Sequence, residues 1–172
     1  MPSYNEEANI ESVIRSWYPV LDLAGDASKL VVADSGSSDR THGILLKLKE
    51  DFPKLEILET DHPGHGPKLI ALYRYACDSG ADLVFQTDSD GQTDPAEFKG
   101  FLSEIPGCDA VIGTRPVRGD GRSRAFVEKV VCVLLGMYFG VKVTDANAPF
   151  RLMRTGLILK YLDRFDRHYN LP

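Results

Sequence analysis

The chain has 172 residues, of which 43% are hydrophobic, and a formal net charge of -5 from 20 basic and 25 acidic side chains. This length and composition predict a single domain over residues 1–172, built around one hydrophobic core. The sequence contains no long basic run, which argues against a nucleic-acid-binding protein that acts by neutralising phosphates. Its three cysteines are widely spaced, so neither a disulfide framework nor a zinc site is predicted.

Helices and strands are predicted to alternate along the chain. Asn5 is a predicted N-cap, and apolar residues then recur at helical spacing from Ile10 to Leu21. Further helices are predicted around residues 44–48 and 69–76 and after Asp94, and strands at residues 29–33, 55–59, 83–85 and 110–113. This alternation predicts an α/β sandwich with a mostly parallel central sheet, in which ligands bind where the carboxyl ends of strands meet the loops.

Both ends of the chain are unusual for such a domain. A hydrophobic strand is expected directly before Pro2, where the sequence has only Met1, and the chain ends on Tyr-Asn-Leu-Pro without a stop signal. We therefore expect that an N-terminal strand and a C-terminal part are missing.

Two aspartates follow the apolar residues of the predicted strand 83–85. Because side chains on an extended chain alternate between faces, Asp88 and Asp90 are expected to point the same way, and Gln92 can follow them. These oxygen ligands suit a hard divalent ion such as Mg²⁺ or Mn²⁺, although an isolated Asp-x-Asp is also explained by two solvated loop carboxylates. Asp94 is interpreted instead as the N-cap of the next helix, in Asp-Pro-Ala-Glu.

Three loops each follow a strand and are expected to converge on one crevice. They are formed by residues 2–6, 34–41 and 88–92. Asp34 comes directly after a strand and could accept a hydrogen bond from the imide of a base; the alternative is an ordinary turn that leads into a helix.

A fourth loop precedes the helix around residues 69–76. Lys68 lies where backbone N–H groups and an ammonium favour phosphate, with a flexible turn as the alternative. His62 and His65 lack carboxylate or cysteine partners at metal spacing and are interpreted as loop residues.

The combination of motifs is more specific than any one of them. In order, the chain contains Pro-Ser-Tyr-Asn-Glu-Glu, Asp-Ser-Gly-Ser-Ser-Asp-Arg-Thr, Gly-His-Gly-Pro-Lys, Asp-Ser-Asp-Gly-Gln-Thr-Asp-Pro, Ile-Gly-Thr-Arg and Asp-Ala-Asn-Ala-Pro-Phe-Arg. This series resembles the family 2 glycosyltransferases over nearly the whole chain, and most of all the branch of dolichyl-phosphate mannosyltransferase-like and polyprenyl-phosphate glycosyltransferases.

The resemblance implies a GT-A fold, a UDP- or GDP-sugar donor, a divalent metal and inversion at the anomeric carbon. The residues it assigns to the nucleoside are Pro2, Tyr4, Glu6 and Asp34, and those it assigns to metal and diphosphate are Asp88, Asp90 and Gln92. Lys68 is expected to add a second positive contact to the leaving diphosphate. Mg²⁺ or Mn²⁺ would act as the Lewis acid for that leaving group.

The acceptor is expected to be polyprenyl or dolichyl phosphate, which is already an anion and needs no protein base. Arg115, with Arg122 or Arg124, would hold this phosphate by charge-assisted hydrogen bonds. If the acceptor is instead a saccharide hydroxyl, a base is required, and Asp145 is the candidate, with helix capping as its alternative role.

The chain departs from the family pattern at two places. Ser35 stands where a second aspartate is frequent, which should matter little because Asp34 is retained, and Ala148-Pro149 replaces the usual Ser/Thr-Gly before Phe-Arg. Two rival functions are a domain that binds nucleotide without turnover and a sugar nucleotidyltransferase. The latter would carry a glycine-rich basic loop where this chain has Tyr-Asn-Glu-Glu.

Basic residues precede an apolar run in the sequence from Arg122 to Phe139. The run is too short to span a bilayer, but a helix there would suit either the core or the headgroup region of a membrane. We expect a cytoplasmic protein that works at the cytoplasmic face of a membrane.

Overall fold

The computed structural model describes residues 1–60, 64–114 and 148–165, together with the isolated positions 130, 132, 133, 137 and 140. The strands within these residues are β1 (Pro2–Ser3), β2 (Leu30–Asp34), β3 (Leu55–Leu58), β4 (Leu83–Gln86), β5 (Ala110–Ile112) and β6 (Arg151–Arg154). The helices are α1 (Ile10–Trp17), α2 (Leu21–Ala24), α3 (Thr41–Asp51), α4 (His65–Asp78), α5 (Phe98–Glu104) and α7 (Thr155–Leu162), with short 3₁₀ turns at Tyr18–Val20, Pro95–Glu97 and Ile105–Gly107.

The strands form two sets of three. β1, β2 and β3 pair in parallel, in that order, while β6 lies between β4 and β5 and pairs antiparallel with both. The α/β class and the parallel crossovers are as the sequence predicts, and β6 adds one strand of opposite direction. The sequence missed β6 because its four residues, Arg-Leu-Met-Arg, show neither alternation nor a long apolar run.

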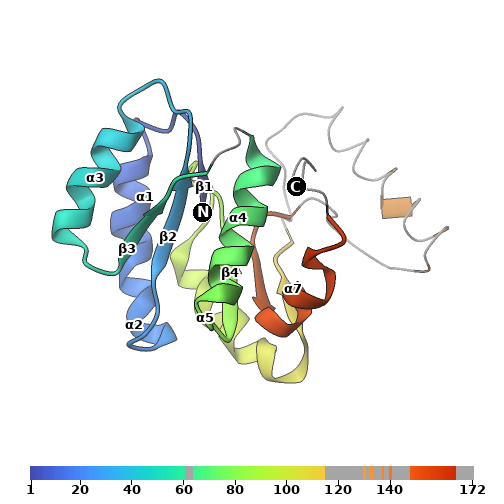
Figure 1. The fold of residues 1–172 in the computed structure, drawn as a ribbon. Coiled ribbons are helices and arrows are strands. Elements are labelled where there is room, and N and C mark those ends of the chain that lie inside the picture. The colour runs from blue at the N-terminus through green and yellow to red at the C-terminus, as the bar shows by residue number, and fades with distance from the viewer. Residues whose placement is uncertain are drawn as a thin grey trace.

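Alternating side chains give the strands two apolar faces, and helices cover both. On one face, Val32, Phe85 and Leu152 join the core formed with α1, α3 and α5. On the other, Ala33 and Val84 pack with residues of α4 and α7. Both strand sets contribute to each cluster, so they act as one layer between two layers of helices (Figure 1).

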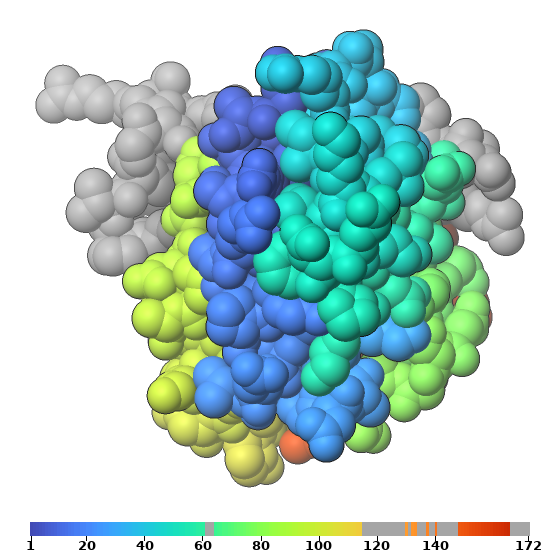
Figure 2. Space-filling view, turned by 90° about the vertical axis from the view of Figure 1, so that its left-hand side faces the viewer, coloured from blue at the N-terminus to red at the C-terminus, as the bar shows by residue number. Residues whose placement is uncertain are grey.

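The outer face on the β3 side is formed by two neighbouring helices. Figure 2 shows α1, in blue, and α3, in cyan to teal, lying side by side over this part of the molecule. α1 presents Ile10, Val13, Ile14 and Trp17 to the core, as their helical spacing predicts. No described helix is long and apolar enough to cross a membrane.

Two predictions about helix starts had different outcomes. Asp94 is an N-cap, since its carboxylate accepts a hydrogen bond from the Ala96 amide at 2.9 Å. The prediction that Asn5 is an N-cap is wrong, because α1 begins only at Ile10 and Asn5 has a φ of 54°. The apolar run after Arg124 lies outside the described residues except for its isolated positions.

Phe85 is the centre of the aromatic part of the core. Its ring centroid lies 5.0 to 5.5 Å from those of Trp17, Phe98, Phe101 and Phe150, which bring β4, α1, α5 and the segment before β6 together. Such tilted and edge-on contacts add to the stabilisation that comes from burying apolar area.

We predict that Phe85→Ala lowers the free energy of unfolding by about 3 to 5 kcal/mol, because it leaves a cavity among four rings. Urea unfolding followed by circular dichroism measures the loss. Leu159→Ala is the matched control, since Leu159 lies on the exposed side of α7 and should change stability little. Equal losses in the two variants would contradict this account of the core.

Candidate functional site

The loops after β1 and β2 are joined by hydrogen bonds, and we call residues 4–7 and 37–41 together the loop clasp. Its bonds are Asn5 N to Ser37 Oγ (3.0 Å), Ser38 N to Asn5 Oδ1 (2.8 Å), Glu6 N to Thr41 Oγ1 (2.8 Å), Glu7 N to Asp39 Oδ2 (3.1 Å) and Arg40 N to Glu7 Oε2 (3.0 Å). The left-handed φ of Asn5 turns the first loop towards the second, a conformation that asparagine tolerates better than most residues. The clasp therefore fixes the position of both loops at the edge of the sheet.

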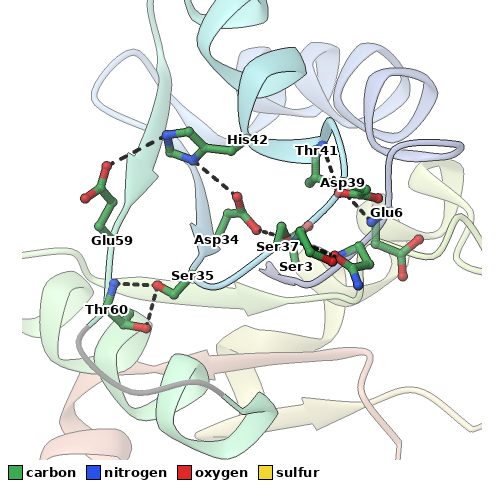
Figure 3. Close-up of polar contacts among 12 residues, drawn as sticks. Ser3, Glu6, Asp34, Ser35, Ser37, Asp39, Thr41, His42, Glu59 and Thr60 are labelled. Carbon is green, nitrogen blue, oxygen red and sulfur yellow. Dashed lines mark hydrogen bonds and ion pairs between the residues drawn. The ribbon is translucent and has the colours of Figure 1, made fainter.

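Asp34 is the last residue of β2 and is only 3% exposed. One carboxylate oxygen accepts a hydrogen bond from Ser37 Oγ at 2.5 Å, and the other lies 3.2 Å from His42 Nδ1 (Figure 3). The cleft beside this carboxylate is lined by Asp34, Ser35, Gly36, Ser37, His42, Glu59 and Thr60, and we call it the β2 cleft.

A second cleft, of about 450 Å³, opens beside β1 and the start of α4. It is lined by Pro2, Ser3, Tyr4, Glu6, Gly64, His65, Lys68, Asp88, Ser89 and Asp90, and we call it the α4 cleft. Ser3 of this cleft and Asp34 of the β2 cleft are register partners on neighbouring parallel strands. The two clefts therefore lie at the same edge of the sheet, where strand carboxyl ends meet the loops.

Lys68 is almost completely buried at the floor of the α4 cleft, with 1% of its surface exposed. Its ammonium donates a hydrogen bond to the Ser3 carbonyl at 2.5 Å and lies 5.2 Å from the centre of the Tyr4 ring. Burial lowers the pKa of Lys68, and the negative charge of Asp34 acts in the opposite direction. This cation thus links α4 to β1 and lies within electrostatic reach of both clefts.

Asp88 and Asp90 both line the α4 cleft. Asp90 Oδ1 accepts a hydrogen bond from the Gln92 amide at 3.0 Å across a turn in which Gly91 has a φ of 77°. Two carboxylates facing one solvent-accessible cleft fit a hard divalent cation that takes its remaining ligands from phosphate and water. Within the described part of the chain, no group of three or more His, Cys, Asp or Glu side chains is gathered for a metal.

The structure brings most of the sequence-predicted site residues together. Pro2, Tyr4, Glu6, Lys68, Asp88 and Asp90 share the α4 cleft, and Asp34 lies in the β2 cleft. Gln92 is exposed and is not among the residues that line either cleft. Arg115, Arg122, Arg124 and Asp145 lie outside the described residues.

Two histidines are part of the site, and sequence reasoning missed both. His65 was predicted to be a loop residue, but it is the first residue of α4 and lines the α4 cleft. Burial lowers its pKa, the charge of Asp88 raises it, and the charges of Lys68 and Arg151 lower it further. His42 shares the β2 cleft with Asp34, a contact that a separation of eight residues does not signal in the sequence.

Comparison with known protein families adds an independent finding. The family described as Glycosyl transferase family 2 matches residues 1–162 of the chain. This chain belongs to glycosyl transferase family 2. The family that the sequence motifs resemble is thereby confirmed.

Curated relatives of the chain include two undecaprenyl-phosphate sugar transferases. The chain is 25% identical over 175 residues to undecaprenyl-phosphate 4-deoxy-4-formamido-L-arabinose transferase of Shewanella sediminis, with 100% of this chain and 52% of that protein covered. It is 28% identical over 160 residues to undecaprenyl-phosphate mannosyltransferase of Micrococcus luteus, with 90% of this chain and 64% of that protein covered. The chain thus spans between half and two thirds of the length of these relatives.

Solved structures confirm the GT-A type of fold. Glucosyl-3-phosphoglycerate synthase from Mycobacterium tuberculosis in complex with UDP superposes with a TM-score of 0.67 at 23% identity, covering 99% of this chain and 71% of that one. The same enzyme in complex with Mn²⁺ and UDP-glucose gives a TM-score of 0.68 at 28% identity, covering 91% of this chain and 55% of that one.

We predict that Asn5→Ala destabilises the protein by about 1 to 2 kcal/mol, because alanine loses the bond to the Ser38 amide and strains at positive φ. Asn5→Gly removes the same side chain but tolerates the backbone angle, so it should lie between the wild type and Asn5→Ala. Urea unfolding of the three proteins checks the order. If Asn5→Ala matches the wild type, the clasp does not hold the loops.

Proposed function

We propose that this family 2 chain is an inverting glycosyltransferase domain that moves a sugar from a UDP- or GDP-sugar to polyprenyl phosphate. The observation that carries the proposal is the α4 cleft, which Asp88, Asp90 and Lys68 line, at the same edge of the sheet as Asp34 of the β2 cleft. A nucleotide sugar with its metal requires three kinds of group. These are acidic side chains that bind the cation, a lysine that faces the diphosphate and a buried hydrogen-bond acceptor for the nucleobase.

Each residue has a role that follows from its chemistry. Asp34 accepts a hydrogen bond from the N–H of a uracil or guanine, while Pro2, Tyr4 and Glu6 line the path from the base to the diphosphate. Lys68 places a positive charge at the floor of the cleft, where it stabilises a negatively charged diphosphate.

Asp88 and Asp90 would hold Mg²⁺ or Mn²⁺. When bound, such an ion supplies Lewis-acid stabilisation of the leaving nucleoside diphosphate. Support for manganese comes from the structural relative that was solved with Mn²⁺ and UDP-glucose. Gln92, which is exposed and does not line the cleft, remains our third candidate ligand.

The two undecaprenyl-phosphate relatives support a lipid phosphate as the acceptor. Such an acceptor carries its own negative oxygen, so the attack on the anomeric carbon needs no protein base. Arg115, Arg122 and Arg124 remain our candidates for holding it, by charge-assisted hydrogen bonds. Because this acceptor is a lipid, we place the reaction at a membrane surface.

One incubation tests the reaction class. The protein is mixed with UDP- or GDP-sugars, Mn²⁺ and undecaprenyl phosphate in vesicles, and both the released nucleotide and the lipid product are measured. Nucleoside diphosphate and glycosylated lipid in equal amounts support the proposal. Pyrophosphate chemistry would indicate a nucleotidyltransferase, binding without turnover a regulatory domain, and transfer only to added saccharides a hydroxyl acceptor; each would overturn it.

We predict that Asp90→Ala weakens Mn²⁺ binding by at least about tenfold, because it removes one of the two carboxylates in the α4 cleft. Calorimetric titration of Mn²⁺ in the presence of UDP or GDP measures the change. Asp94→Ala is the matched control from the same loop, since that aspartate caps a helix turn and should leave Mn²⁺ affinity unchanged. Equal Mn²⁺ affinity in wild type and Asp90→Ala would remove Asp90 from the metal site.

We predict that Asp34→Asn weakens nucleoside diphosphate binding about 5- to 150-fold, because an amide presents a donor where a buried acceptor is needed. Calorimetric titration with UDP and with GDP, in the absence of metal, measures the change in affinity directly. Asp26→Asn removes the same charge from an exposed position and should bind as the wild type does. If Asp34→Asn also binds as the wild type does, Asp34 does not contact the base.

A further inference from the structure

His42 lies between two acidic side chains that come from different strands. It is the second residue of α3, and its Nδ1 is 3.2 Å from Asp34 Oδ2 while its Nε2 is 3.8 Å from Glu59 Oε1 (Figure 3). Asp34 ends β2, and Glu59 follows directly after β3. The imidazole therefore spans the β2 cleft from its helix side.

The surroundings of the three side chains differ. Asp34 is buried, whereas the His42 side chain is 38% exposed and that of Glu59 is 81% exposed. Glu59 can turn to water at little cost, so the contact of His42 with Asp34 is the better defined of the two. The negative charge of Asp34 also acts on Lys68 of α4, but the Lys68 ammonium donates its hydrogen bond to the Ser3 carbonyl.

A carboxylate that accepts a hydrogen bond from a nucleobase must be ionised and correctly oriented. Ser37 Oγ donates a hydrogen bond to Asp34 Oδ1, and His42 Nδ1 lies 3.2 Å from Oδ2, where the tautomer with its proton on Nδ1 donates to that oxygen. Each oxygen of a carboxylate has two lone-pair sites, so a donor on each still leaves acceptor capacity towards the cleft. Without the histidine, the Ser37 hydroxyl alone of these two donors would hold the carboxylate, and the planar group would turn more easily about its Cβ–Cγ bond.

We propose that His42 is a positioning residue, which orients the Asp34 carboxylate so that it accepts the ring N–H of the nucleotide base. This inference rests on the proposed function, because it assumes that Asp34 contacts the base. It assigns to a residue of α3 a part in base recognition that none of the motifs in the sequence indicated.

The test compares ligands that have or lack the N–H in question. UDP is compared with its N3-methyl form and GDP with its N1-methyl form, each by calorimetry on the whole chain. In the wild type, the base that fits should lose affinity on methylation. In His42→Ala, affinity for the unmethylated ligand should fall about tenfold while affinity for the methylated ligand hardly changes, so the methylation penalty shrinks.

Two conservative variants separate positioning from a general structural role. His42→Asn places an amide N–H close to the Nδ1 position and should restore most of the methylation penalty. His42→Gln is of similar size but places its amide nearer to the Nε2 position, so it should behave like His42→Ala. A purely structural role would weaken both ligands alike, and the asparagine variant would then have no advantage.

The outcomes distinguish the two proposals. If the wild type binds neither nucleotide, or binds methylated and unmethylated ligands equally, the assignment of Asp34 to the base fails, and this inference fails with it. If the wild type discriminates and both His42→Ala and His42→Gln keep the full methylation penalty, only the inference about His42 is overturned. Thermal unfolding of each variant shows whether the fold is retained. If His42→Ala is unfolded, the methylation penalty of His42→Gln tests the inference in its place.

Discussion

The site depends on one buried ion, the ammonium of Lys68. Burying a lysine is costly unless other groups compensate, and here a hydrogen bond to the Ser3 carbonyl and the charge of Asp34 do so. Because Ser3 and Asp34 are register partners on β1 and β2, the cation stabilises the pairing of the two strands that carry the binding loops. The same lysine lines the α4 cleft, so one charge both fixes the packing of α4 and faces the space in which we propose that the diphosphate binds.

Strand alternation explains why the candidate site has two parts. Leu30, Val32 and Asp34 share the face of β2 that is covered by α1 and α3, and Asp34 therefore meets His42 of α3. Ala33 points to the opposite face, where α4 packs, and the α4 cleft lies on that side with Lys68 and His65. A ligand that crosses the edge of the sheet can thus contact Asp34 on one side, which we propose accepts from the base, and Asp88 and Asp90 on the other, which we propose hold the cation.

The features that the sequence predicted correctly are those that depend on residues close together in the chain. The Ile10 to Trp17 stripe, the Asp94 cap and the strand before Asp88 were correct, because each rests on spacing within a few residues. Asn5 was misassigned because its side chain bonds a loop more than thirty residues away, which no local cap rule includes. β6 was missed because Leu152 and Met153 bury on opposite faces within only four residues.

The candidate site also contains some residues that sequence patterns predicted and others that they did not. Motif order gathered Tyr4, Glu6, Lys68, Asp88 and Asp90, all of which line one cleft, because the loops after parallel strands must open at one edge of a sheet. His42 and His65 were not found, since their places in the clefts depend on how α3 and α4 dock on the strands. Gln92 followed the alternation rule in the sequence, but the turn at Gly91 ends the extended chain before that residue.

Ser35, the departure from the family pattern next to Asp34, has a structural explanation. Its Oγ accepts a hydrogen bond from the Thr60 amide at 2.6 Å and lies 2.8 Å from Thr60 Oγ1, so it connects the end of β2 to the residue after Glu59. This connection helps to hold Glu59 within reach of His42. An aspartate at position 35 would add a third negative charge to a cleft that already contains Asp34 and Glu59, and mutual repulsion would favour moving one of them away. Serine provides the connection without that charge, which leaves Asp34 as the buried acidic acceptor of the β2 cleft.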